Sequence, residues 1–262
     1  MLLVWTEILR TTTIPAVLLA LLLSNSVSSR METSLHRQLK MLYSSSMSEQ
    51  EVTVDGYRID AVHDGRLVEI QYGSLGAIRE KIRDLLENHD VLVVKPLAAR
   101  KYLVNKTKRG GAVTSARYSP TKQTFYDLFD DLVHFVSVFP HPRLTIEAVL
   151  TEQEEHRVPT KKRRRRSKGY RVEDRKLTSL GKRLQLATVN DLLSMLSPQL
   201  PTPFTTADIA RTSEVPRWLA QKMAYCLRKT EATRIVGKQG NALLYCGAGE
   251  LPPKENNSVK VA

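Results

Sequence analysis

The chain has 262 residues, 42% of them apolar, which is enough to bury the core of one large or two modest soluble domains. Forty Lys and Arg residues against 27 Asp and Glu leave a formal net charge of +13, which favours nucleic acid as a partner, and an anionic membrane surface second. The only two cysteines, Cys226 and Cys246, exclude a disulfide framework and a zinc finger, and we expect both to be small buried side chains.

An apolar run over residues 14–23 follows Arg10 and precedes the small polar residues 24–29. The run is too short to span a bilayer, which takes about 20 residues. One interpretation is a signal peptide, with a secreted mature chain beginning after about residue 29. The other, which we favour because nothing downstream requires an oxidising compartment, is a start codon assigned too early, with a cytoplasmic protein beginning at Met31. In both cases we expect residues 1–30 to lie outside the fold and no membrane segment in the mature chain.

Residues 32–43 predict a short amphipathic helix, because Leu35, Leu39 and Leu42 recur at helical spacing. Its polar face carries Glu32, His36 and Lys40. Alternating segments then predict strands over 51–54, 57–62 and 67–72. Asp64-Gly65, between the second and third strands, is a strong hairpin signal.

A second helix is predicted over residues 75–88, and the apolar run 91–94, which ends at Lys95-Pro96, predicts a strand buried on both faces. A hairpin, a crossover helix and a buried strand indicate an α/β fold with a mixed sheet. Further on, we expect a basic strand and loop over 101–121, a helix over 125–138 and a strand over 144–150. The segment 161–176 then holds ten Lys and Arg residues against two acidic ones.

The segment from Pro201 to Cys246 predicts a helix, a turn, a second helix after Pro216 and a small hairpin, which is the order of a winged helix. The second helix directs polar and aromatic side chains outward in a pattern that suits a DNA groove. The alternative interpretation is a protein-docking module in which Trp218 belongs to the core. The residues expected to contact DNA are Arg163, Arg164, Arg165 and Arg166 of the basic segment, with Arg217, Trp218, Gln221, Lys222, Arg228 and Lys238 of the winged helix.

Around a two-residue turn at Asp64-Gly65, residues whose numbers sum to 129 face each other. Asp60 then lies opposite Glu69, at a separation where like charges destabilise a sheet, so that a divalent cation would compensate them. The alternative is a half-exposed hairpin in which Arg58 neutralises both acids.

These residues resemble the PD-(D/E)xK nuclease superfamily, whose pattern is an acid on a first helix, an acid on a strand and a (D/E)-x-K triplet on the next strand. The matching segments are Glu32-Thr33-Ser34-Leu35-His36, Gly56-Tyr57-Arg58-Ile59-Asp60-Ala61-Val62 and Glu69-Ile70-Gln71. The resemblance covers residues 31–150 and departs at the triplet, where Gln71 replaces the lysine.

The resemblance implies a restriction-endonuclease-like core of the order αβββαβ and a metal-dependent deoxyribonuclease. Mg²⁺ or Mn²⁺ would be bound by Asp60, Glu69 and the carbonyl of Ile70, with Glu32 beside it and Gln71 positioning the attacking water. Auxiliary roles are expected for His36 and Arg58. Lys81 and Lys95 are the two lysines that could replace the lysine missing from the triplet. Many members of the superfamily act as dimers, so we also expect a homodimer.

The sequence thus predicts a nuclease-like domain over 31–198, a winged-helix domain over 199–250 and a disordered tail over 251–262. The predicted function is hydrolysis of DNA phosphodiester bonds, assisted by the winged helix. A non-catalytic DNA-binding or regulatory protein built on a degenerate nuclease core is the alternative. A secreted protein whose charge binds an anionic surface is a third hypothesis.

Overall fold

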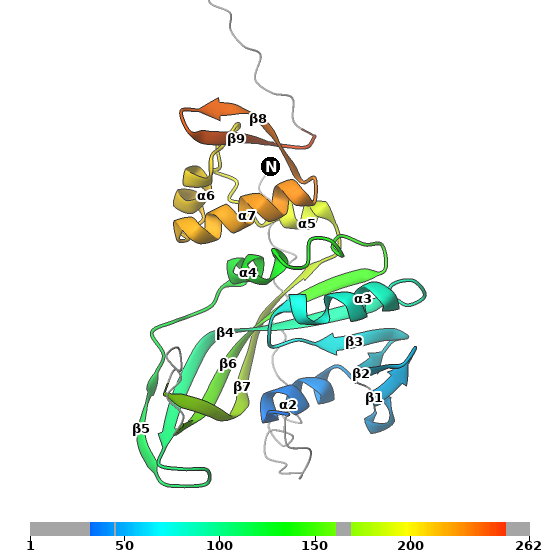
Figure 1. The fold of residues 1–262 in the computed structure, drawn as a ribbon, viewed down its shortest axis with the longest axis vertical. Helices are drawn as coiled ribbons and strands as arrows, with labels where there is room; N and C mark the ends of the chain where they lie inside the picture. The colour runs from blue at the N-terminus through cyan, green and yellow to red at the C-terminus, as the bar shows by residue number, and fades with distance from the viewer. Residues whose placement is uncertain (1–31, 45, 161–168, 250–262) are drawn as a thin grey trace, which may run out of the picture. The chain divides into compact units, whose positions relative to one another are not determined.

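The structure is a computed structural model that describes residues 32–44, 46–160 and 169–249, and it divides into two compact units (Figure 1). Unit 1 comprises residues up to Ser74, 80–125 and 143–185, and unit 2 comprises 75–79, 126–142 and the chain from Leu186 onward. The chain passes between the units several times, so the expected boundary at residue 198 does not coincide with this division. The predictions for residues 1–30, 163–166 and 251–262 lie outside the described residues.

Unit 1 is an α/β unit built on one mixed sheet, as predicted. Strands run in the order β1-β2-β3-β4-β6-β7, and β5 pairs with β4. The first three are antiparallel, whereas β4 is parallel to both β3 and β6. The strands are β1 (Gln50–Val54), β2 (Tyr57–His63), β3 (Arg66–Ile70), β4 (Val91–Lys106), β5 (Val113–Tyr118), β6 (Leu144–Pro159) and β7 (Tyr170–Leu186).

The hairpin of β2 and β3 turns at Asp64-Gly65 as predicted. Both residues have positive φ, +49° and +73°, which is the backbone that a two-residue turn of this kind requires. The register pairs His63 with Arg66 and Ala61 with Val68, so the numbers of paired residues sum to the expected value. A tight turn therefore fixes which side chains reach each face of the sheet.

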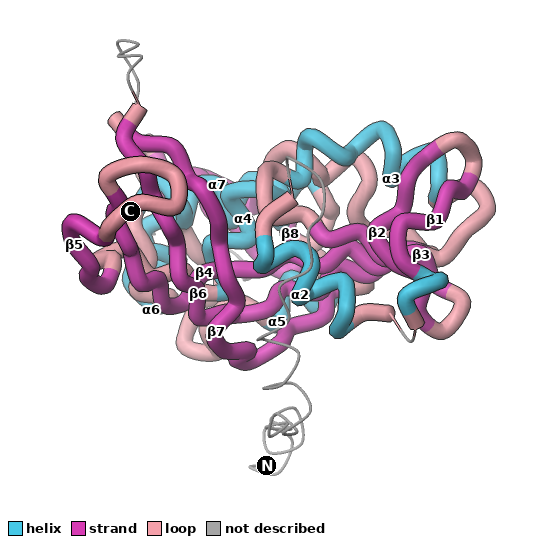
Figure 2. Tube along the Cα trace, turned by 90° about the horizontal axis from the view of Figure 1, so that it is seen from below, coloured by secondary structure: helices cyan, strands magenta, loops and turns pink. Residues whose placement is uncertain are grey.

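Helix α2 (Ser34–Leu42) and helix α3 (Arg79–Leu85) lie on opposite faces of this part of the sheet (Figure 2). The apolar stripe of α2 packs on alternate strand residues, so the predicted amphipathic helix is confirmed. The core on this face is Leu35, Leu39, Tyr43, Ala61, Val68, Ile70, Leu92, Val94, Val149 and Leu177. The polar edge of α2 is thereby held against the ends of β1 and β2.

Four strands differ from the sequence-based predictions. Strand β4 continues past Lys95-Pro96 to Lys106, although Pro96 was expected to end it. Pairing with β3 stops at Val94, whereas β6 pairs with β4 from Val91 to Asn105, so Pro96 lies where β3 no longer flanks the strand. Strand β6 likewise extends beyond Leu150, and the second half of the basic segment lies in β7. Strand β5, within the predicted basic loop, was missed.

Unit 2 contains short helices and a two-stranded sheet. The helix expected over 125–138 is shorter than predicted. It begins as a 3-10 turn, η3 (Phe125–Asp127), where the chain passes from unit 1 into unit 2, and continues as α4 (Leu128–Leu132). After the 3-10 turn η2 (Leu75–Ile78), the remaining elements are α5 (Val189–Ser194), α6 (Thr206–Thr212), α7 (Arg217–Lys229), β8 (Thr233–Gln239) and β9 (Ala242–Gly247). Cys226 and Cys246 are free and buried, as predicted, and burial raises the pKa of the Cys226 thiol to about 12.

Candidate functional site

Asp60 lies at a break in the sheet of unit 1. Pairing of β2 with β3 ends at Ala61 and Val68, and pairing of β1 with β2 passes from residue 61 to residue 59. Asp60 and Glu69 are therefore not a paired position of the ladder, although we expected them to face each other. The Asp60 carboxylate instead accepts a hydrogen bond of 2.8 Å from the backbone N–H of Ile70, and its other oxygen lies 2.9 Å from Nε2 of His36 on α2.

Glu69 is held from the other face of the sheet. The ammonium group of Lys81, on α3, lies 2.6 Å from the Glu69 carboxylate and donates a second hydrogen bond of 2.5 Å to the carbonyl oxygen of Arg58. Lys81 therefore joins the ends of β2 and β3 at the point where their backbones separate. Of the two lysines expected to assist the acids, Lys81 has this contact, whereas Lys95 is buried and donates to the carbonyl oxygens of Tyr72 and Gly73.

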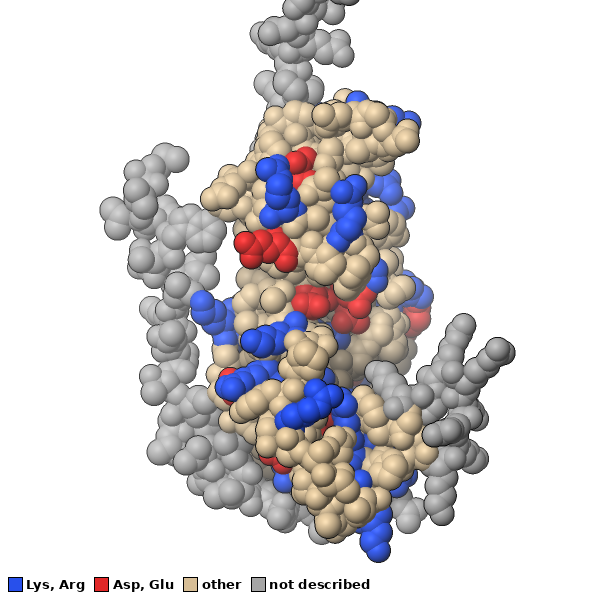
Figure 3. Space-filling view, turned by 90° about the vertical axis from the view of Figure 1, so that its left-hand side faces the viewer, with Lys and Arg blue, Asp and Glu red and all other residues tan. Residues whose placement is uncertain are grey.

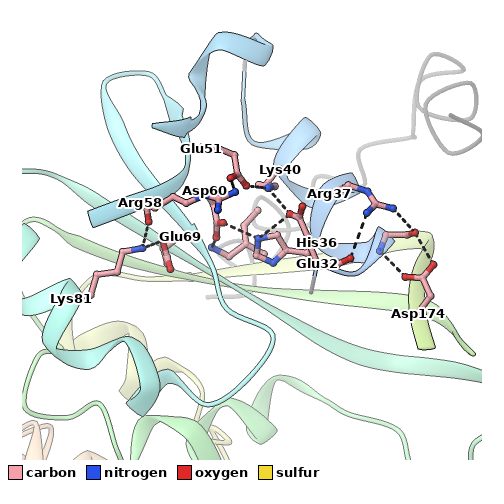
Figure 4. Close-up of polar contacts among 12 residues, drawn as sticks. Glu32, His36, Arg37, Lys40, Glu51, Arg58, Asp60, Glu69, Lys81 and Asp174 are labelled. Atoms are coloured by element: carbon pink, nitrogen blue, oxygen red, sulfur yellow. Dashed lines mark hydrogen bonds and ion pairs between the residues drawn. The ribbon is translucent and has the colours of Figure 1, made fainter. Parts of the chain in front are cut away.

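A network of charged side chains connects α2 to β1 and β2 (Figure 4). Lys40 is 4% exposed and forms ion pairs with Glu32, at 2.5 Å, and with Glu51. Arg58 pairs with Glu51 and no ion pair with Asp60 or Glu69 is found among the described residues, so the alternative interpretation, in which it neutralises those acids, is wrong. One oxygen of Glu32 is buried and has no hydrogen-bond partner among the described residues, although it lies within ion-pair distance of both Lys40 and His36.

The pKa values of the two central acids shift in opposite directions. Burial by itself raises the pKa of Asp60, but the hydrogen bond and charge of His36, together with the Ile70 N–H, outweigh it and leave the pKa below its ordinary value. Burial, followed by the negative charge of Asp60, raises the pKa of Glu69, and Lys81 offsets this rise only in part. The surroundings of Asp60 thus stabilise its ionised carboxylate, whereas ionisation of Glu69 is less favourable than in water.

The cluster of Glu32, Glu51, Asp60, Glu69, Lys40, Arg58, Lys81 and His36 holds more negative than positive side chains when His36 is neutral. Four carboxylates face three cations, so one further positive charge would balance it. A bound divalent cation would supply two positive charges and bring the net charge of the cluster to +1. Among the residues the structure describes, no group of three or more His, Cys, Asp and Glu side chains is placed to hold a metal ion.

Two members of this cluster, Lys40 and Glu51, were not among the predicted site residues. Lys40 lies one helical turn beyond His36 and two beyond Glu32, so its place on the polar face was visible in the sequence. Glu51 has a φ of +60°, a backbone conformation that is costly for a non-glycine residue and that no sequence pattern indicates. Gln71, expected beside the acids, donates instead to the carbonyl oxygen of Ser74 at 2.7 Å.

In unit 2, α7 directs the predicted side chains outward. Trp218 is 50% exposed, so the interpretation of it as a core residue is wrong. Lys222 lies 5.2 Å from the centre of the Trp218 ring and pairs with Asp130. The other predicted contact residues of this unit are exposed, namely Arg217, Gln221, Arg228 and Lys238. The opposite side of α7 is buried, including Leu219, Ala220, Met223, Ala224 and Leu227.

Together these features define a two-unit α/β protein with a buried charged cluster at a break in its mixed sheet. Residues 33–187 match the model of a family described as Domain of unknown function (DUF8091), and the chain belongs to this family. It is also 31% identical over 228 residues to a protein of Treponema pallidum (strain Nichols) described as "Uncharacterized protein", covering 87% of this chain and 88% of that one. No solved structure matches the chain. No helix within the described residues is long and apolar enough to cross a membrane.

Proposed function

We propose that this protein is a metal-dependent nuclease that hydrolyses phosphodiester bonds of DNA, with Asp60 and Glu69 as its central acids. The observation that carries the proposal is the placement of both acids where β2 and β3 separate, together with a lysine on Glu69. In the superfamily that the sequence resembles, a lysine follows the second acid on the same strand. Here Lys81 of the crossover helix contacts Glu69 and would serve in place of the lysine that Gln71 replaces.

The topology of unit 1 also supports the proposal. A helix, three antiparallel strands, a crossover helix and a parallel fourth strand follow one another as α2, β1, β2, β3, α3 and β4. This is the αβββαβ order that the resemblance implies. The order of α6, α7, β8 and β9 likewise supports a winged helix, whose exposed Trp218 and basic neighbours suit contact with DNA.

The oxygen donors in the cluster fit a hard divalent cation such as Mg²⁺ or Mn²⁺. Mg²⁺ is typically bound by one or two carboxylates and completes its shell with water and substrate phosphate, so it does not require three acidic side chains. Asp60, Glu69 and the carbonyl of Ile70 would hold it. Burial, followed by the negative charge of Asp60, raises the pKa of Glu69, and a cation between the two carboxylates would offset that negative charge. When bound, such a cation lowers the pKa of a coordinated water and polarises a phosphodiester.

The residues of the chain have separate roles in this proposal. His36 and the Ile70 N–H fix the orientation of Asp60 and keep it ionised. Lys81, which donates to Glu69, would be available to donate to the attacking water or to a phosphate oxygen. Lys40 holds Glu32 and Glu51 beside the site and is a positioning residue.

A non-catalytic DNA-binding protein is the second candidate. The observation that favours it is that each central acid already has a positively charged or hydrogen-bonding partner, His36 for Asp60 and Lys81 for Glu69, while Gln71 bonds elsewhere. In this case the cluster would be a structural ion network, and the exposed basic residues would bind DNA without cleaving it.

The two functions are separated by incubating the full chain with supercoiled plasmid, branched DNA and single-stranded DNA in Mg²⁺ or Mn²⁺. We expect cleavage by the wild type, loss of cleavage in Asp60→Asn, and a decrease of at least roughly a hundredfold in Lys81→Met. The matched control is Arg83→Met, on the same helix, because Arg83 forms an exposed pair with Glu80. Cleavage that is unchanged in Asp60→Asn contradicts the site, and no cleavage by the wild type on any substrate supports the binding protein.

A further inference from the structure

A second feature of unit 1 lies on the parts of β4 and β5 that extend beyond β3. The rings of Tyr102 on β4 and Tyr118 on β5 meet edge to face, with their centres 4.9 Å apart. The guanidinium of Arg100 lies 4.0 Å from the centre of the Tyr118 ring. Tyr118 is nevertheless 52% exposed. An aromatic platform braced by a cation is thus presented to solvent at the edge of the sheet.

This platform borders a cavity of about 220 Å³. Its lining includes Arg100, Tyr102 and Tyr118, and the oxygen-bearing side chains Glu152, Glu154 and Thr178 of β6 and β7. The register places Arg100 beside Glu152 and Tyr102 beside Glu154, so these four side chains project from one face of the sheet. The cavity therefore combines an aromatic surface with several hydrogen-bond acceptors.

The surroundings of the cavity are exposed and positively charged. All six residues of β5 are exposed, and Arg117 of β5 and Lys108 and Arg109 of the preceding loop are exposed with them. Figure 3 views the molecule from the side on which β5 lies, and Lys and Arg side chains gather over the lower part of this face. A polyanion that follows β5 would find both cations for its charges and a ring on which to stack.

The chemistry of the cavity distinguishes between ligands. Glu152 lies 4.0 Å from Arg100 and Glu154 pairs with His156, so the cavity offers no unpaired positive charge to a bare phosphate. A cationic side chain of a partner protein would meet Arg100, which already covers the Tyr118 ring. An unstacked nucleobase is neutral, it can stack on the part of the Tyr118 ring that Arg100 leaves exposed, and its amino group can donate to the carboxylate oxygens.

We propose that this cavity binds one unstacked base of single-stranded DNA, with the strand's phosphates along the exposed cations of β5 and its loop. The inference deepens the proposed function, on which it rests for the choice of DNA as substrate, and it assigns a single-stranded segment to that substrate. Bases with an exocyclic amino group, such as cytosine, are preferred over thymine, which lacks one.

The test is the fluorescence anisotropy of labelled oligo(dC) and oligo(dT), about 12 nucleotides long, mixed with the full chain in EDTA. Tyr118→Ala is expected to weaken binding of oligo(dC) roughly tenfold, and Tyr118→Phe to restore it, since the ring alone provides stacking. Glu152→Ala should reduce the preference for oligo(dC) over oligo(dT). Tyr57→Ala is the matched control, because Tyr57 lies on β2 and its hydroxyl bonds to Asp84.

Unchanged affinity in Tyr118→Ala, or equal affinity of the wild type for the two oligonucleotides, overturns the inference. Binding of an arginine-rich peptide in place of single-stranded DNA overturns it in favour of a protein partner. If Tyr118 proves necessary for binding while no cleavage is found with Mg²⁺ or Mn²⁺, this inference holds and the proposed nuclease function fails. If cleavage depends on Asp60 while the affinity for single-stranded DNA does not change in Tyr118→Ala, the proposed nuclease function holds and this inference fails.

Discussion

Replacing Lys40 by Met should destabilise unit 1 substantially. The Lys40 side chain is 4% exposed and forms ion pairs with both Glu32 and Glu51, whose side chains are 17% and 30% exposed. Removing one partner of a buried ion pair typically costs about 3–5 kcal/mol, because an uncompensated charge stays buried. Since both glutamates keep some contact with water, we expect the free energy of unfolding to fall by about 3 kcal/mol.

The measurement is urea denaturation followed by circular dichroism, supported by thermal melting, in which each kcal/mol corresponds to about 2–4 °C for a domain of this size. Arg83→Met is the control, because its exposed pair with Glu80 should contribute at most about 1 kcal/mol. Adding Glu51→Gln to Lys40→Met should recover part of the loss, since the amide needs no opposite charge. A cost for Lys40→Met no larger than that of the control would refute the reasoning.

Three further predictions concern other parts of the molecule. Folding raises the pKa of Glu69, so the contribution of this residue to stability is present below its ordinary pKa and is lost as the pH rises through the raised pKa. Glu69→Gln should therefore be more stable than the wild type at pH 7, by roughly 1 kcal/mol or less, but not at pH 4. Urea denaturation at the two pH values measures this difference. Gly65→Ala should lower the free energy of unfolding by about 1–2 kcal/mol, because φ is +73° at Gly65, whereas Gly249→Ala, with open space around it, should change it by less than about 0.5 kcal/mol. Trp218→Ala should weaken binding of duplex DNA roughly fivefold in fluorescence anisotropy without altering the melting temperature, and an unchanged affinity would exclude this face of α7 from the interface.

The local elements of the site could be predicted because their signals are short-range. Asp64-Gly65 defines a turn whose φ angles few other pairs adopt readily, and the turn sets the register of β2 on β3. The apolar stripe of α2 places His36 on its polar edge, and Glu32, which precedes the helix although residue 32 was predicted to begin it, lies 3.7 Å from His36. These features depend on neighbouring residues, whereas the expectation that Glu32 lies beside Asp60 and Glu69 came from the resemblance to the nuclease superfamily.

The lengths of the long strands were not predictable in this way. Residues 101–105 of β4 and 152–157 of β6 include Lys101, Gln153 and Glu155, whose polarity interrupts the apolar pattern of a buried strand. They extend the sheet because they pair with each other across about fifty residues of sequence, and Glu155 is compensated by Lys101, Arg157 and Arg175. Strand length here is a property of the pair and not of either segment.

The sequence by itself determined helix α2, the hairpin turn and the outward side of α7, because backbone preference and apolar spacing act over a few residues. Only the tertiary structure decided which cation neutralises each acid. Lys81 and Lys95 both follow β3 within twenty-six residues of Glu69, yet Lys81 contacts Glu69 while Lys95 binds backbone carbonyls. That choice depends on how α3 crosses the sheet, because an ion pair forms between side chains that packing brings within a few ångströms of each other.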